Sequence, residues 1–178
     1  MIELNIFPEC NVDTKIAEIL GGAKKKYNHH AGVGGVSNKM QTNKLKDQPV
    51  LGIIDEDKGK GSIPKYFLEF YTILEKDNLI LKGHPNKKHF LILVCPAAEK
   101  WLMNDAKRVG ISPTSDEYNL PDKLKDFTDI SKIKDIDRNE GFYRFIKALV
   151  REKSPSITTL KLWIELFKEN NLDSLKTK

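Results

Sequence analysis

The segment PVLGIIDEDKGKG, residues 49–61, decides the fold class. Residues 50–54 form a continuous apolar run rich in β-branched side chains, bounded by Pro49 and by a loop of glycines and lysines. An uninterrupted apolar run of this length is typical of a strand that is covered on both faces. We therefore predict a central strand here, ending at the acidic triplet of residues 55–57.

Three other segments are predicted to be strands. Residues 2–7 alternate apolar and polar side chains, and residues 79–81 and 90–94 are short apolar runs separated by a turn-like stretch. Segments with helical periodicity lie between and after these strands. This alternation favours an α/β fold with a mainly parallel sheet and helices on both faces.

The predicted helices are placed by caps and breakers. Asp13 is the expected N-cap of a first helix whose last turn carries the lysines 24–26, and Gly32, Gly34 and Gly35 are expected to break regular structure before a short helix that begins at Ser37.

Ser62 and Pro64 are expected to start a helix that reaches Leu74, and another follows Pro96 and ends near Gly110. Residues 111–138 are predicted to be loops and short helical pieces, and two amphipathic helices close the chain, one around residues 142–149 and one around residues 160–167.

Length and composition indicate one domain with a packed core. The chain has 178 residues, of which 39% are hydrophobic, and its net charge is +5. We expect one domain over residues 1–178, with a core at 2–105 and a helical C-terminal portion at 111–172. We expect a cytoplasmic protein without a membrane span or a secretory signal.

Acidic side chains follow two of the predicted strands. Glu9 comes after the first, and Asp55 and Asp57 come after the central one. Asp55 and Asp57 are two residues apart, so that in an extended chain both side chains leave on the same face. An acidic triplet alone is more typical of a solvated turn, but Glu9 at the end of another strand favours a site for Mg²⁺ or Mn²⁺.

The order of these elements resembles the Toprim domain of topoisomerases, primases, ribosomal RNA maturases and OLD-family nucleases. Residues 8–13, PECNVD, resemble the strand–EG–x–x–D opening of that family, with Glu9 in the glutamate position and Asp13 at the later acidic one. The DED triplet matches its aspartate pair. Cys10 departs from the pattern, because glycine is usual there.

A later segment resembles the OLD-like branch. Residues 96–102, PAAEKWL, place Glu99 where those nucleases have a glutamate before a hydrophobic helix, and Lys153 is the candidate for their late lysine. The resemblance covers roughly residues 2–105. It implies a Rossmann-type Toprim fold and metal ligands Glu9, Asp13, Asp55, Asp57 and Glu99, with Lys153 assisting catalysis.

The resemblance implies a metal-dependent nuclease that acts on DNA or RNA. OLD-like nucleases normally accompany an ATPase, and because the sequence has no P-loop motif we expect a separate ATPase subunit, as in an antiphage or toxin-like system. Two alternatives stay open. One is a catalytically inactive Toprim-like module that binds nucleic acid or a protein partner, and the other is a receiver-like or hydrolase-like phosphoryl-transfer domain.

Basic and other polar residues complete the predicted site. Lys58 and Lys60, with Ser37 and Lys39, are expected to contact nucleic acid, although a flexible basic turn at 58–60 is equally consistent with the sequence. The histidines lack the spacing of a zinc site, and Cys10 has no identifiable partner for thiol catalysis. The tryptophans and most phenylalanines fall at helical spacing and are predicted to be core.

Overall fold

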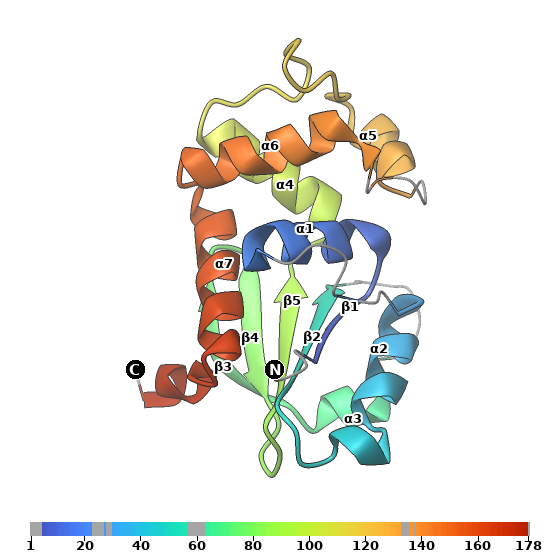
Figure 1. Cartoon of the computed structure of the whole chain (residues 1–178), viewed down its shortest axis with the longest axis vertical. Coiled ribbons are helices and arrows are strands. Elements are labelled where there is room, and N and C mark those ends of the chain that lie inside the picture. Colours follow the sequence, from blue (N-terminus) through green and yellow to red (C-terminus); the bar gives the residue numbers. More distant parts are fainter. Residues whose placement is uncertain are drawn as a thin grey trace.

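A five-stranded mixed sheet organises the chain (Figure 1). The computed structural model describes residues 5–22, 27, 30–56, 63–132, 136 and 138–177. The strand order is β1-β2-β5-β4-β3, with β1 (Ile6–Pro8), β2 (Val50–Asp55) and β5 (His89–Val94) parallel to one another. β4 (Leu79–Gly83) and β3 (Tyr71–Lys76) continue the sheet in antiparallel pairing. The predicted α/β class is confirmed, and only one half of the sheet is parallel.

The central strand is covered on both faces, as its apolar run predicts. Leu51 and Ile53 of β2 belong to a core cluster with α1, α4, α6 and α7, whereas Val50 and Ile54 belong to a second cluster with α2 and α3. Gly52 faces the second cluster, where an added Cβ would lie 3.0 Å from the sulfur of Met40. This close approach explains why glycine interrupts the aliphatic run.

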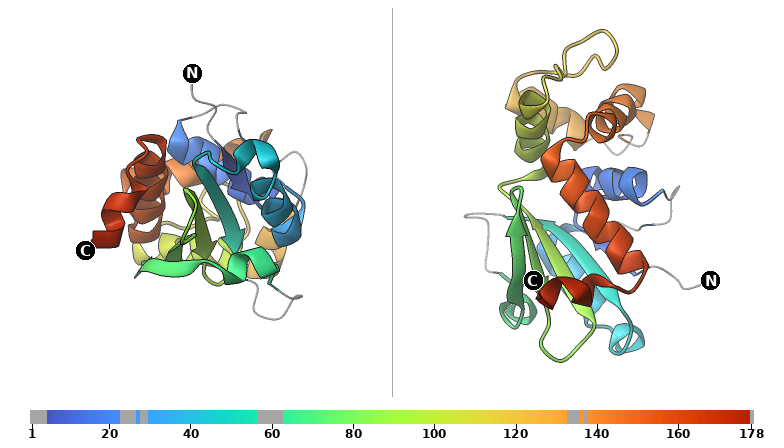
Figure 2. Two further views of the ribbon diagram at one scale, coloured as in Figure 1. Left: turned by 90° about the horizontal axis from the view of Figure 1, so that it is seen from below. Right: turned by 90° about the vertical axis from the view of Figure 1, so that its left-hand side faces the viewer.

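Helices lie on both faces and beyond one end of the sheet (Figures 1 and 2). α1 (Asn11–Gly21) and α7 (Pro155–Lys168) cover one face, and α2 (Gly32–Met40) and α3 (Lys65–Leu68) cover the other. α4 (Ala98–Arg108), α5 (Leu124–Ser131) and α6 (Glu140–Arg151) form a layer beyond the carboxyl ends of the parallel strands. Two 3-10 helices, η1 (Asn43–Leu45) and η3 (Leu172–Thr177), complete the fold.

The first core cluster joins the sheet to the C-terminal helices. It extends from Ile6 to Leu172 and contains Trp101 and Trp163, each 1% exposed, as the periodicity of their helices predicts. Asp105 of α4 binds the first turn of α7, because its carboxylate accepts hydrogen bonds from the hydroxyl and amide of Ser156 and from the amide of Ile157. The helical layer and the sheet therefore share one apolar core, and Asp105 additionally joins α4 to α7.

Several local predictions were wrong. Cys10, not Asp13, is the N-cap of α1, and Asp13 lies in its first turn. The glycines at 32, 34 and 35 belong to α2, because the buried side chains of Val36 and Met40 pack this helix against β2 and outweigh the low helix propensity of glycine. Tyr71 and Leu74 lie on strand β3, so the helix before them is only α3.

Several other boundaries agree with the sequence, although β1 begins at Ile6 and ends at Pro8 and so is shorter than the strand predicted at residues 2–7. α4 is followed by Gly110, which has φ of 72°, and α6 and α7 occupy the two predicted C-terminal segments. The predicted end of the first helix was wrong, because α1 ends at Gly21 with Gly22 as its C-cap and no basic residue lies in its last turn. The lysines 24–26 and Ser62 themselves lie outside the described residues.

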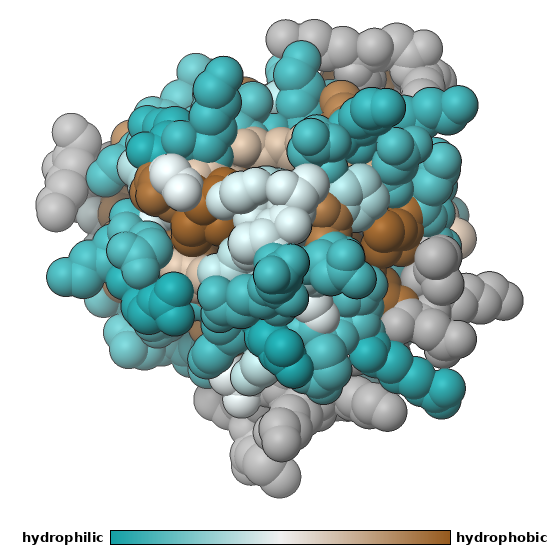
Figure 3. Space-filling view, turned by 90° about the horizontal axis from the view of Figure 1, so that it is seen from above, coloured by the Kyte–Doolittle hydropathy of each residue, from teal (hydrophilic) through white to brown (hydrophobic). Residues whose placement is uncertain are grey.

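The outer face of the helical layer is mostly hydrophilic, and its hydrophobic areas are small and separate (Figure 3). Among the described residues, the helices are all too short or too polar to span a lipid bilayer.

Candidate functional site: an acidic cleft at the carboxyl ends of three strands

Three carboxylates converge where the parallel strands end. Glu9 follows β1, Asp55 is the last residue of β2, and Glu99 lies in the first turn of α4, shortly after β5. Since β1, β2 and β5 are neighbours and parallel, all three segments reach the same edge of the sheet. The topology therefore brings together residues that are up to 90 positions apart in the sequence (9 to 99).

Hydrogen bonds orient two of these carboxylates. The backbone amide of Asp55 donates to Oε2 of Glu9 at 3.0 Å, and the amide of Ala98 donates to Oδ1 of Asp55 at 2.9 Å. The amide of Glu9 in turn donates to the carbonyl of Ile53 at 2.9 Å. These bonds join β1, β2 and the start of α4 around the acidic side chains.

Asp13 lies buried behind this group and is 3% exposed. Burial raises the pKa of its carboxyl well above the ordinary value of 3.8, and the negative charges of Asp55, Glu9 and Glu99 raise this pKa further. The thiol of Cys10 donates to Oδ2 of Asp13 at 3.0 Å. Asp13 therefore lies close enough to the other three acids for their negative charges to raise its pKa.

Cys10 itself is unsuited to thiol catalysis. Burial raises the pKa of its thiol, and the neighbouring charge of Asp13 raises this pKa further. A thiol with a raised pKa holds its proton, whereas nucleophilic cysteines act as thiolates. The role of Cys10 is to cap α1 and to hold Asp13 through the same sulfur atom.

The acids border an open cleft of about 640 Å³. Glu9, Asp55 and Glu99 line one part of it, and α5 lines another with Thr128, Ser131 and Lys132. The hydroxyl of Ser131 donates to Oε1 of Glu99, which fixes that side chain at the wall of the cleft. Lys100 also lines the cleft, so that two lysines of the described part of the chain, Lys100 and Lys132, lie beside the acids.

Several helices, among them α1, α2 and α4, begin at this cleft. Its wall includes Cys10 and Asn11 at the start of α1, Ala31 and Gly32 at the start of α2, and Ala97 at the start of α4. Helix N-termini carry unsatisfied amides and partial positive charge, and they favour carboxylates and phosphates. The electrostatics of the cleft therefore combine fixed acids with several donors for an anionic ligand.

The donor chemistry fits a hard divalent cation, but the described side chains do not form a preorganised cage. Among the described residues, no group of three or more His, Cys, Asp or Glu side chains is arranged to hold a metal ion. Mg²⁺ usually keeps several waters and binds through one or two carboxylates plus substrate phosphate, so a complete protein cage is not required. The predicted ligand Asp57 lies outside the described residues.

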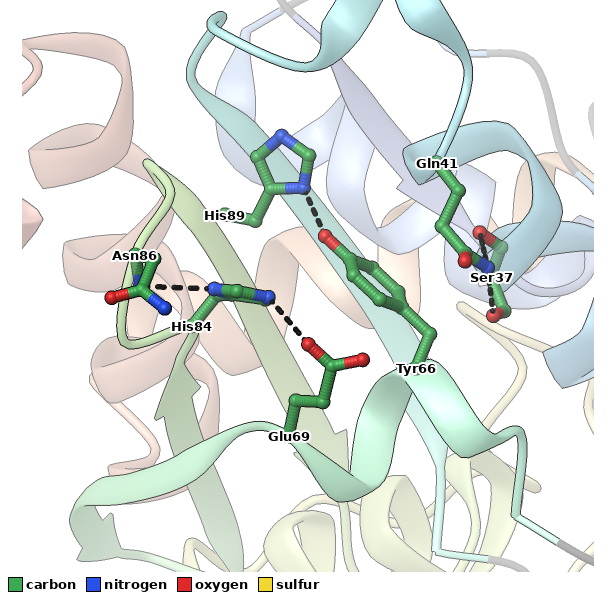
Figure 4. A network of polar contacts seen from close by, with 7 residues as sticks. All are labelled: Ser37, Gln41, Tyr66, Glu69, His84, Asn86 and His89. Carbon is green, nitrogen blue, oxygen red and sulfur yellow. Dashed lines mark hydrogen bonds and ion pairs between the residues drawn. The ribbon is translucent and has the colours of Figure 1, made fainter.

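The other predicted contacts are distributed differently. Lys58 and Lys60 lie outside the described residues. Lys39 is exposed, and its Nζ lies 5.7 Å from the ring centroid of Phe7. Ser37 is 2% exposed and accepts a hydrogen bond from Gln41 (Figure 4), so its hydroxyl is not presented to a nucleic acid.

Lys153 is not brought to the cleft. It lies in the turn between α6 and α7 with φ of 52°, and it is absent from the wall of the cleft. The lysines that do line the cleft, Lys100 and Lys132, were missed by sequence reasoning. Lys100 could have been found from the sequence, because it directly follows the candidate Glu99. Lys132 reaches the cleft only through the packing of α5 against α4.

A separate polar network lies at the other end of β5 (Figure 4). His89 is fully buried; its Nε2 donates to the carbonyl of Leu45 at 2.9 Å, and its Nδ1 accepts from the hydroxyl of Tyr66. Burial lowers the pKa of His89. His84 donates to Glu69 and accepts from the amide of Asn86. Because these groups satisfy one another, we assign the network to packing.

Comparison of the chain with protein-family models, with curated proteins and with solved structures finds no match.

Proposed function

We propose that the chain is a divalent-metal-dependent nuclease of the Toprim type, similar to the OLD-like branch, and that its substrate phosphodiester binds in the acidic cleft. The observation that carries this proposal is the convergence of Glu9, Asp55 and Glu99 at the carboxyl ends of three adjacent strands. Asp13 adds a fourth acid whose pKa responds to the other three. Such a concentration of negative charge is favourable when a cation joins the side chains.

Glu9, Asp55 and Glu99 would hold Mg²⁺ or Mn²⁺, with Asp57 as a further ligand. When bound, the metal supplies positive charge to the phosphate and lowers the pKa of a bound water. The chain's own contribution is to orient the acids. The amides of Asp55 and Ala98 fix Glu9 and Asp55, and the hydroxyl of Ser131 fixes Glu99.

The two cations of the cleft have a separate role in this proposal. Lys100 and Lys132 bind the non-bridging oxygens of the substrate and its neighbouring phosphates, as ammonium groups do at other phosphate sites. The starts of α1, α2 and α4 add the positive ends of their helix dipoles for the same anion. A separate ATPase subunit remains part of the proposal on the basis of the OLD-like resemblance alone.

The test is a cleavage assay on labelled single- and double-stranded DNA and RNA with Mg²⁺, Mn²⁺ or EDTA. Wild type is compared with Glu9→Gln, Asp55→Asn and Glu99→Gln, and Glu75→Gln on the exposed edge of β3 is the matched control. We expect each cleft variant to lose at least about 100-fold, because even outer-shell partners of metal ligands are worth 10–100-fold. Cleavage that persists in EDTA, or in the three cleft variants, rules out this mechanism.

One observation favours a second candidate, a catalytically inactive Toprim-like module. Oε2 of Glu9 and Oδ1 of Asp55 each accept a backbone amide, and the described side chains form no preorganised metal cage. In that case the cleft binds nucleic acid or a protein partner without cleaving it. Nucleic-acid binding that is unchanged by EDTA, with no cleavage of any of the four substrates, distinguishes this module from the nuclease.

A further inference from the structure

A second cavity, of about 290 Å³, lies at the opposite end of α1 from the acidic cleft. Its wall is formed by Gly21 and Gly22 at the end of α1, by Lys147 of α6, and by Lys161 and Lys168 of α7. These three helices lie against one another in Figure 1. We call this cavity the lysine pocket, after Lys147, Lys161 and Lys168.

The lysine pocket has an excess of positive charge. Among the described residues, its wall contains three lysines and one acid, Glu165, so that these four side chains have a net formal charge of +2. Glu165 forms an ion pair with Lys161 at 3.7 Å, and both side chains are more than 40% exposed. An exposed pair of this kind is worth at most about 1 kcal/mol, so an anionic ligand can compete with it.

The other two lysines are held at the rim by contacts that leave their charge in place. Nζ of Lys168 donates to the carbonyl of Gly21 at 2.8 Å, and Nζ of Lys147 lies 6.0 Å from the ring centroid of Tyr143. Arg144, Lys147 and Arg151 follow one another at spacings of three and four on α6 and are all exposed. Arg151 forms an ion pair with Glu152 at 3.0 Å, so the positive charge that continues from the pocket along this face comes mainly from Arg144.

The position of the pocket relates it to the acidic cleft. α1 spans 11 residues, with its first residue at the cleft and its last at the pocket. At a rise of 1.5 Å per residue, the two sites are about 15 Å apart. Successive phosphates of one duplex strand advance by only about 3.4 Å along the axis, so one nucleic acid of a few nucleotides is long enough to reach both sites.

We infer that the lysine pocket binds a backbone phosphate of the nucleic acid, a few nucleotides from the phosphodiester in the acidic cleft. This inference rests on the proposed function for the location of the reacting bond. The ligand class follows from the pocket, because clustered lysines beside a stripe of arginine and lysine recognise phosphates without regard to sequence. The pocket contributes affinity, and the cleft contributes the chemistry.

The experiment measures binding separately from cleavage. Fluorescently labelled 20-mer duplex DNA, single-stranded DNA and single-stranded RNA are titrated in EDTA with wild type, with Lys147→Glu and with the combined Lys147→Ala, Lys161→Ala and Lys168→Ala variant. The control combines Lys46→Ala, Lys65→Ala and Lys88→Ala, which removes the same charge from exposed positions at the other end of the sheet. Lys147→Glu guards against misfolding, because Lys147 is exposed on α6 and a charged side chain is retained there.

We expect both pocket variants to bind at least one of the three nucleic acids more weakly than the control does. The slope of log Kd against log salt should fall by about 0.9 for each phosphate of duplex DNA that the variant no longer neutralises. Equal affinities for the pocket and control variants, or no binding by wild type, overturn the inference.

Failure of the nuclease proposal gives a different result. Hydrolysis of bis(p-nitrophenyl) phosphate by wild type with Mn²⁺ tests the cleft alone, because this substrate is too small to reach the pocket. No hydrolysis, together with lysine-dependent binding, contradicts the nuclease and leaves the pocket as a nucleic-acid site. Hydrolysis without lysine-dependent binding supports the nuclease and removes the pocket.

Discussion

Replacing Asp105 by alanine should weaken the whole fold, because this side chain joins α4 to α7. Asp105 is fully buried, and its carboxylate accepts from the hydroxyl of Ser156 at 2.7 Å, from the amide of Ser156 at 3.2 Å and from the amide of Ile157 at 3.3 Å. The two amides belong to the first turn of α7, where no intrahelical acceptor exists. Asp105 therefore acts as a cap supplied by another helix.

The expected loss is about 3 kcal/mol. Loss of a helix cap costs about 1 kcal/mol, and each buried donor left without a partner costs about 1–3 kcal/mol. For a chain of this length, 1 kcal/mol corresponds to about 2–4 °C in Tm, so Asp105→Ala should melt about 6–12 °C lower than wild type. Ser156→Ala removes the hydroxyl bond alone and should lower Tm by about 2–4 °C.

Thermal and urea unfolding monitored by circular dichroism measure this effect. Asp116→Ala is the matched control, because Asp116 is exposed in the loop before α5. An unchanged urea m-value shows that the loss is one of stability and not of denatured-state compactness. A Tm within 2 °C of wild type for Asp105→Ala would refute the cap.

Three further predictions concern charge. The folded-state pKa of Asp13 is raised above 3.8, so its favourable contribution to stability is complete below about pH 3.8 and is lost as pH rises through the folded pKa. Asp13→Asn should therefore be more stable than wild type at pH 8, by on the order of 1 kcal/mol in urea unfolding. An equal or lower stability of the variant contradicts this. The folded-state pKa of His89 is lowered from 6.5, so its contribution to stability is present above about pH 6.5 and declines as pH falls toward the folded pKa. Tyr66→Phe should cost about 1–3 kcal/mol at pH 8 in urea unfolding, because the hydroxyl that donates to Nδ1 of His89 is lost. A loss below about 0.5 kcal/mol contradicts this hydrogen bond. Mn²⁺ at 100 times its Kd should stabilise wild type by about 2.7 kcal/mol, or about 5–11 °C in a thermal-shift assay. The control variant Glu75→Gln should respond in the same way. A shift of equal size in Glu9→Gln and Asp55→Asn argues against the cleft as the binding site.

The sequence predicted best where a single local signal determined the outcome. The apolar run of residues 50–54 identified β2, and the periodicity around Trp101 and Trp163 identified α4 and α7. Glu9 and Asp55 were identified as candidates because each follows a predicted strand, and Glu99 because its segment resembles the OLD-like branch. The sheet order then placed these segments side by side. Strand order itself was not predictable from these local patterns.

Predictions failed where tertiary packing outweighed local preference. Glycines at 32, 34 and 35 indicated a break, yet the burial of Val36 and Met40 against β2 stabilises a helix there. Aromatic spacing at 67–74 resembled a helix, but residues 71–76 pair with β4 as the outer strand. Lys132 gave no local signal at all, since its position at the cleft depends on how α5 packs on α4.

The hydrogen bond from the amide of Ala98 to Asp55 has a mechanical consequence. The same carboxylate that faces the cleft also anchors the first turn of α4, and α4 carries Glu99 and contacts α5. Any ligand that binds or displaces the carboxylate of Asp55 therefore weakens the hydrogen bond that attaches the first turn of α4 to β2. The hydrogen-exchange rate of the Ala98 amide should therefore change when a ligand binds at Asp55.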